Sequence, residues 1–185
     1  MASRTSDTLR TKSALSVNVA DLVARPGSTK RVKLEGHLDG LNLQLAHVPP
    51  DSPLGLDLRL DAIVEGIAVT GSVSSTVSVE CRRCLATTGT DLLVAVNELY
   101  SLPGQPHAEE GYSLRGDDLD LEPMIRDVLL LAMPLNPLCR EECRGLCSVC
   151  GQDLNARDCG HRPEPDVRWQ PLRGLKETLG KTKED

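Results

Sequence analysis

The sequence predicts an α+β protein: an antiparallel, barrel-like or twisted β-sheet with a packed helix and a small C-terminal zinc-binding segment. Three observations lead to this expectation. Apolar and polar residues alternate over much of residues 54–85, as they do in half-buried strands. The pattern changes to a helical period near residue 123. Six potential metal ligands are concentrated in residues 139–161.

The β-rich domain is expected to span residues 14–121. Residues 14–24 have the pattern of a short strand followed by a helical turn, and residues 30–38 alternate as a strand does. Residues 54–85 carry the strongest strand signal, because leucine and valine recur at alternate positions and glycines interrupt the run. The core must rest on aliphatic side chains, since the chain has no Phe, two Tyr and one Trp.

A turn is expected at residues 87–89, where Thr-Thr-Gly precedes an apolar run over residues 91–100. That run is predicted to be the next strand. The polar residues 103–118 are expected to form a loop before the helix.

Residues 122–138 are predicted to form a packing helix and a linker. Glu122 and Pro123 suit a first helical turn, and Pro134 ends the pattern. The apolar face expected to pack on the sheet consists of Met124, Ile125, Val128, Leu129 and Ala132, widened by Leu130 and Leu131. Residues 1–13 are expected to be a disordered N-terminus. Residues 162–185 are expected to be a charged C-terminal tail with one short helix, PLRGLKETL.

Charge is unevenly spread along the chain. Residues 1–35 carry seven basic and three acidic residues, residues 36–135 carry five and fifteen, and residues 136–185 carry nine of each. Proteins that coat nucleic acid are usually basic throughout, so contact with phosphate is expected only from the ends of this chain. No apolar run is long enough for a membrane span or typical of a signal peptide. We therefore expect a cytoplasmic protein with no membrane partner.

The C-terminal cysteines predict a structural zinc site. Thiolates separated by two or three residues can reach one ion through a tight turn, and Gly145 and Gly151 supply backbone freedom beside Cys147 and Cys150. Cysteines in a reducing compartment favour metal binding over disulfides. The most compact predicted ligand set is Cys139, Cys143, Cys147 and Cys150, with Cys159 and His161 as alternatives for one or two of them.

The remaining pair, Cys81 and Cys84, lies at the end of the β run and leaves several alternatives open. A CxxC pair can be redox-active, but redox pairs usually begin a helix. It can also be an ordinary pair at a hairpin bend, or complete a second zinc site with Cys159 and His161. We find no nucleotide-binding, hydrolase or metalloprotease motif, so we expect neither an enzyme nor a small-molecule substrate.

Several segments resemble the YceD family, whose members are called large ribosomal RNA subunit accumulation proteins. They are VECRRCL, DLEPMIRDVLLLAMPLNPLC, CRGLCSVCGQDLN and the ending DVRWQPLRGL, and the resemblance covers about residues 15–175. Some members lack the C-terminal cysteines, so zinc is not a property shared by the whole family. Members that have them often end in Cys-x-Cys, where this chain has Cys159, Gly160 and His161.

The resemblance implies a non-catalytic factor that supports large-subunit ribosomal RNA accumulation and ribosome assembly. Its implied partner is that RNA or the pre-ribosome, and basic ribosomal proteins are a second candidate for the acidic middle of the chain. Because aromatic residues are scarce, RNA would be held through its phosphates rather than by base stacking. The candidate contacts are Lys30, Arg31, Lys33, Arg82 and Arg83, with Arg140 and Arg144. The alternative is a zinc-stabilised protein-interaction module without direct RNA contact.

Overall fold

The chain divides into two compact units in this computed structural model. The first, the β-sheet unit, comprises Met1–Arg82 and Ala86–Cys139. The second, the cysteine unit, comprises Arg83–Leu85 and Arg140–Asp185.

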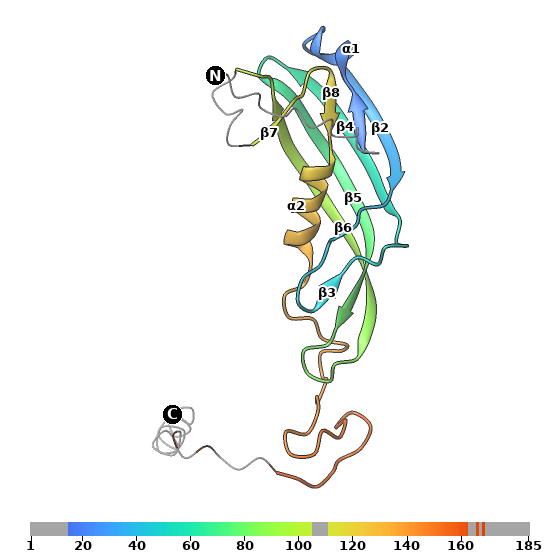
Figure 1. Cartoon of the computed structure of the whole chain (residues 1–185), viewed down its shortest axis with the longest axis vertical. Helices are drawn as coiled ribbons and strands as arrows, with labels where there is room; N and C mark the ends of the chain where they lie inside the picture. The colour runs from blue at the N-terminus through green and yellow to red at the C-terminus, as the bar shows by residue number, and fades with distance from the viewer. Residues whose placement is uncertain (1–14, 105–110, 163–165, 167, 169–185) are drawn as a thin grey trace, which may run out of the picture. The chain divides into compact units, whose positions relative to one another are not determined.

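The structure describes residues 15–104, 111–162, 166 and 168 (Figure 1). The N-terminal segment expected to be disordered, residues 1–13, lies outside the described residues. So does the short helix expected in the C-terminal tail.

An open sheet forms most of the β-sheet unit. Its strands are, in spatial order, β2 (Thr29–Gly36), β4 (Leu54–Ile63), β5 (Gly66–Glu80), β6 (Thr87–Ser101) and β7 (Tyr112–Ser113), and β3 (Ala46–His47) pairs with the end of β5. All neighbours are antiparallel except β6 and β7. Within the described residues β2 and β7 do not pair, so this sheet is open and not a closed barrel. A separate two-stranded sheet joins β1 (Ser16–Asn18) to β8 (Asp118–Asp120).

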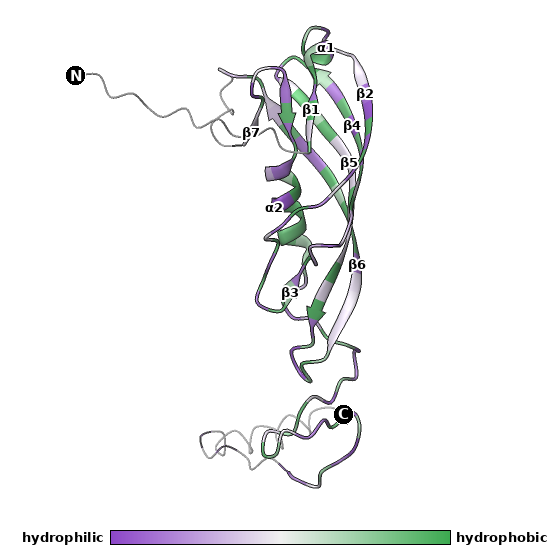
Figure 2. Cartoon of the chain, turned by 45° about the vertical axis from the view of Figure 1, so that its right-hand side comes forward, coloured by the Kyte–Doolittle hydropathy of each residue, from purple (hydrophilic) through white to green (hydrophobic). Residues whose placement is uncertain are grey.

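The alternating sequence pattern places one face of the sheet in the core. Leu56 on β4 pairs with Val73 on β5, which pairs with Val94 on β6. Leu56 and Val73 are buried, and Val94 packs against the core from a partly exposed position. Side chains of successive residues in a strand point to opposite faces of the sheet. The observed register therefore places apolar residues opposite one another on the core-facing side. Figure 2 shows this alternation along the strands.

The helix α2 (Glu122–Ala132) contacts β6 and contributes to the same core. Met124, Ile125 and Leu129 have no exposed surface. Leu131, expected to widen the apolar face, is instead 86% exposed. It follows Leu129 by two residues, which turns its side chain about 200° around the helix axis. The other helix, α1 (Ala20–Val23), is a single turn that buries Leu22.

The prediction of a turn at residues 87–89 is wrong. These residues belong to β6, where Thr87 pairs with Glu80 and Thr88 with Val79. The chain reverses just before them, and Leu85 has a positive φ of 61°. Long strand pairing overrides the local preference of Thr-Thr-Gly for a turn. Within the described residues no helix is long and apolar enough to span a membrane.

Candidate metal centre

A tight turn presents Cys147 and Cys150 in the cysteine unit. The N–H of Cys147 donates to the Gln152 carbonyl, and the N–H of Gly151 donates back to the Cys147 carbonyl, each at 2.9 Å. Gly151 has a φ of 72°, a conformation that residues with a Cβ rarely adopt. The N–H of Val149 points at the sulfur of Cys147 at 3.4 Å. The two-residue spacing therefore turns both thiols to one side and supplies a backbone donor to one of them.

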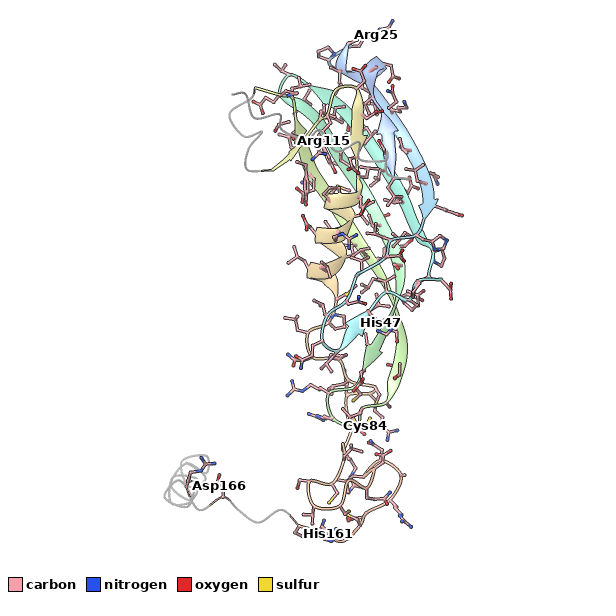
Figure 3. All side chains as sticks on the ribbon, viewed as in Figure 1. Arg25, His47, Cys84, Arg115, His161 and Asp166 are labelled. Carbon is pink, nitrogen blue, oxygen red and sulfur yellow. The ribbon has the colours of Figure 1, made fainter. Side chains whose placement is uncertain are left out.

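A second loop adds Cys159 and His161. The carboxylate of Asp158 accepts the N–H of Gly160 at 2.8 Å, and Gly160 has a φ of 77°. The ligand atoms of Cys147, Cys150, Cys159 and His161 all lie within 4.8 Å of one another. Sulfur atoms around a tetrahedral zinc are about 3.8 Å apart, because each Zn–S bond is about 2.3 Å. We call these four residues the histidine-containing cluster. Figure 3 labels His161.

Hydrogen bonds favour a thiolate in this cluster. The backbone N–H groups of Cys150 and Val149, together with the Cys159 thiol, lower the pKa of Cys147 to about 6. The N–H of His161 favours the Cys159 thiolate. It is outweighed by the neighbouring Cys147 and Cys150 and by burial, so the pKa of Cys159 is raised. The lowered pKa favours the thiolate form of Cys147, and the thiolate is the form that binds a metal ion.

The other four cysteines form a second group, which we call the all-cysteine cluster. Its members are Cys81, Cys84, Cys139 and Cys143, and their sulfur atoms also lie within 4.8 Å of one another. Asn155 donates to the sulfur of Cys143 at 3.5 Å. All seven cysteines therefore belong to one of the two clusters, and His161 completes two sets of four.

Hydrogen bonds within each unit explain part of this grouping. In the β-sheet unit, the N–H of Arg82 donates to the Pro137 carbonyl at 3.0 Å, which brings the chain beside Cys81 close to the chain two residues before Cys139. In the cysteine unit, Arg83 donates from Nη1 to the Cys143 carbonyl at 2.8 Å. The Arg83 carbonyl accepts the N–H of Leu146 at 3.0 Å.

The structure divides the predicted ligand set Cys139, Cys143, Cys147 and Cys150 between the two clusters. Cys159 and His161, which were predicted as alternative ligands, both belong to the histidine-containing cluster. Cys81 and Cys84 lie with Cys139 and Cys143 rather than with Cys159 and His161. The prediction grouped the four cysteines that are compact in sequence. In the structure, Cys139 and Cys143 join Cys81 and Cys84, whereas Cys159 and His161 join Cys147 and Cys150.

The predicted RNA-contacting residues are distributed over both units. Arg31 and Lys33 are exposed on the solvent face of β2, and Lys33 pairs with Asp57 at 2.9 Å. Lys30 has the opposite parity on the strand, and its Nζ donates to the Asn18 carbonyl at 3.1 Å. Arg82 is exposed, while the guanidinium of Arg83 is engaged by Cys143.

These observations define a β-rich protein that carries two clusters of candidate metal ligands. A family-level comparison matches residues 69–176 to the family described as "Large ribosomal RNA subunit accumulation protein YceD". The matched region begins in β5 and includes α2 and every cysteine. The chain belongs to the YceD family, and the resemblance noted in the sequence is confirmed.

Curated relatives match over different lengths. An uncharacterized protein of Mycobacterium tuberculosis is 35% identical over 167 residues, covering 86% of this chain and 80% of the relative. An uncharacterized protein of Mycobacterium leprae is 32% identical over 162 residues, covering 84% and 74%. The Arabidopsis thaliana "Large ribosomal RNA subunit accumulation protein YCED homolog 1, chloroplastic" is 38% identical over 64 residues, covering 34% of this chain and 20% of that protein. No solved structure matches the chain significantly.

Proposed function

We propose that this protein is a non-catalytic cytoplasmic factor that supports large-subunit ribosomal RNA accumulation and ribosome assembly. The observation that carries the proposal is the family match over residues 69–176, because the family is described by that role. The partner is large-subunit ribosomal RNA or the pre-ribosome that contains it.

The proposal includes one Zn²⁺ in each cluster. Four thiolates, or three thiolates and an imidazole, are the donor sets that zinc prefers in structural sites. Four protein ligands leave no open position for water, so the ions would hold the fold rather than activate a substrate. Zinc binding would supply folding free energy to the cysteine unit, which has little regular secondary structure within its described residues.

The same grouping supports a non-catalytic role. Every cysteine of the chain lies beside three other potential ligands. A thiolate shared with a metal ion in a closed site is less available as a nucleophile or redox partner than a free one. The proposal therefore gives Cys81 and Cys84 a metal-binding role rather than a redox role.

The test is the ratio of the two mature ribosomal RNAs in cells that lack the gene. We expect the large-subunit RNA to fall while the small-subunit RNA is much less affected. The wild-type gene, restored on a plasmid, is the control for indirect effects. An unchanged ratio during both slow and fast growth would contradict the ribosomal role.

A protein-interaction module without direct RNA contact is the second candidate. Fifteen acidic residues against five basic ones in residues 36–135 favour it, since such a surface attracts basic proteins rather than phosphate. If purified protein associates with ribosomal proteins and binds no RNA at low salt, this second function replaces direct RNA contact.

A further inference from the structure

The strand β6 has a long free edge. It pairs with β5 along all fifteen residues, from Thr87 to Ser101. On its other side, among the described residues, only Tyr100 and Ser101 pair, with β7. Residues 87–99 therefore present a row of backbone N–H and C=O groups that no described strand uses. Such an edge is a template for another extended chain.

The two edges of the sheet differ in how they are protected. The opposite edge, β2, carries Lys30, Arg31 and Lys33 within eight residues, and charged side chains of this kind discourage strand addition. The strand β6 contains no Lys, Arg or Pro. Its first residues have intermediate hydropathy and appear nearly white in Figure 2. Protection at one edge and not at the other favours a binding role for the unprotected edge.

A hollow lies beside the beginning of this edge, within the β-sheet unit. It has a volume of about 500 Å³. Thr88, Gly89 and Thr90 of β6 line one side, and Asn136 and Leu138, in the segment after α2, line another. Val79 of β5, the partner of Thr88, also lines this hollow, so the hollow lies over the sheet face next to the start of the edge.

Side chains along the edge indicate the chemistry of its occupant. Leu92 and Val94 pack against the core but remain partly exposed, so apolar side chains from an added strand would complete their burial. The charged residues of β6 are Asp91 and Glu98, both acidic. A second copy of β6 would bring the same acidic residues and no cation. An extended segment that alternates apolar and basic residues would place its apolar side chains beside Leu92 and Val94 and its basic ones beside Asp91.

We propose that the free edge of β6 binds an extended basic segment of a partner protein, which adds as a strand beside residues 87–99. Backbone hydrogen bonds would supply affinity, and Asp91, on the solvent face of β6, would select positive charge. The inference is independent of the ribosomal role, because it rests on strand pairing and charge within one unit.

The probe is a short fluorescent peptide of alternating valine and lysine, with blocked ends, added to the full chain as purified. We expect it to bind and to slow amide hydrogen exchange in residues 87–99. The matched peptide has the same sequence with methyl groups on alternate amide nitrogens, which keeps its charge but removes one row of donors. It should bind at least about tenfold more weakly.

Two substitutions distinguish peptide binding at the β6 edge from general attraction of the peptide to an acidic surface. Asp91 and Asp57 are both exposed on the solvent face, the first on β6 and the second on the interior strand β4. Asp91→Lys should weaken peptide binding about tenfold, and Asp57→Lys should change it less than about twofold.

Three results would each overturn the proposal. The first is equal binding of the two peptides, which would mean charge attraction alone. The second is slowed exchange at β2 instead of β6. The third is concentration-dependent self-association that slows exchange in residues 87–99, because the edge would then belong to a second copy of this chain.

Discussion

The rings of Tyr100 and Tyr112 stack with their centroids 5.2 Å apart. They are the only tyrosines of the chain and face each other in the parallel pairing of β6 and β7. The hydroxyl of Tyr100 donates to the Asp120 carbonyl at 2.9 Å, and that of Tyr112 donates to the Asp127 carboxylate at 2.7 Å. One aromatic pair therefore connects β6 and β7 to β8 and to α2.

This pair predicts a loss of stability at alkaline pH. Burial, followed by the neighbouring Tyr112, raises the pKa of Tyr100, and burial with the Asp127 contact raises the pKa of Tyr112. Above pH about 10 the unfolded chain loses phenolic protons that the folded chain keeps. The stabilisation is therefore complete below that pH and declines as the pH rises, by up to about 1.4 kcal/mol per pH unit from Tyr100.

Denaturant unfolding at a series of pH values measures this decline, and Tyr100→Phe should remove most of it. Tyrosinate absorbance provides a separate check. If both phenols of the folded protein ionise near pH 10, as free tyrosine does, the proposed burial of the pair is incorrect.

The helix α2 offers a matched pair of leucines. Leu129 has no exposed surface, whereas Leu131 is 86% exposed. Leu129→Asp should lower the free energy of unfolding by about 3–5 kcal/mol, because it buries an unpaired carboxylate. Leu131→Asp introduces the same charge and should change it by less than about 0.5 kcal/mol. Urea unfolding of the two variants gives the comparison, and equal effects would mean that α2 does not pack as described.

Two glycines make a second matched pair. A Cβ on Gly66 would collide with the carbonyl of Tyr100, whereas at Gly89 the nearest atom is Cγ2 of Thr76, at 4.0 Å. Gly66→Ala should therefore destabilise the β-sheet unit by at least about 2 kcal/mol. Gly89→Ala should stay within about 1 kcal/mol of wild type. A shift in melting temperature confined to the Gly66 variant is the expected result.

Metal content tests how the ligands are grouped. The two clusters predict two equivalents of zinc per chain in protein purified without chelator. Cys159→Ser should reduce this to about one and make the cysteine unit sensitive to proteolysis, since the lost ion no longer supplies folding free energy. The control is Ser148→Ala, which changes an exposed neighbour of Cys147. If a single ion is bound by Cys139, Cys143, Cys147 and Cys150, Cys159→Ser will keep the full metal content.

Sequence periodicity was sufficient for the main elements of the fold. The alternating leucines at 54–60 predicted β4, and the helical period predicted α2 to within a residue at each end. Both signals are local, because they report which side of one element faces the core. The start of β6 was not predictable in this way, since Thr87 and Thr88 are held in a strand by their pairing with β5.

The partition of the cysteines depends on contacts between distant segments. The sequence indicates that Cys81 and Cys84 form one pair and Cys147 and Cys150 another. It does not indicate that the chain near Pro137 hydrogen bonds with the chain near Arg82. The count of seven cysteines and one nearby histidine was a usable signal, because eight ligands suit two tetrahedral ions.

The last prediction concerns direct contact with RNA. Arg31 and Lys33 share the solvent face of β2, and within the described residues Arg31 makes no ion pair. If both contact phosphate, Arg31→Glu combined with Lys33→Glu should weaken binding to purified large-subunit ribosomal RNA. It should also reduce the slope of log affinity against log salt by about 2, because each lost contact releases one fewer counterion.

Filter binding across a range of salt concentrations measures the slope. Arg115→Glu, an exposed change in a segment away from β2 in Figure 3, is the control and should leave the slope nearly unchanged. Since Lys33→Glu places a like charge beside Asp57, an unfolding curve must first show that the double variant is folded. A folded double variant with an unaltered salt slope would exclude this face of β2 from RNA contact.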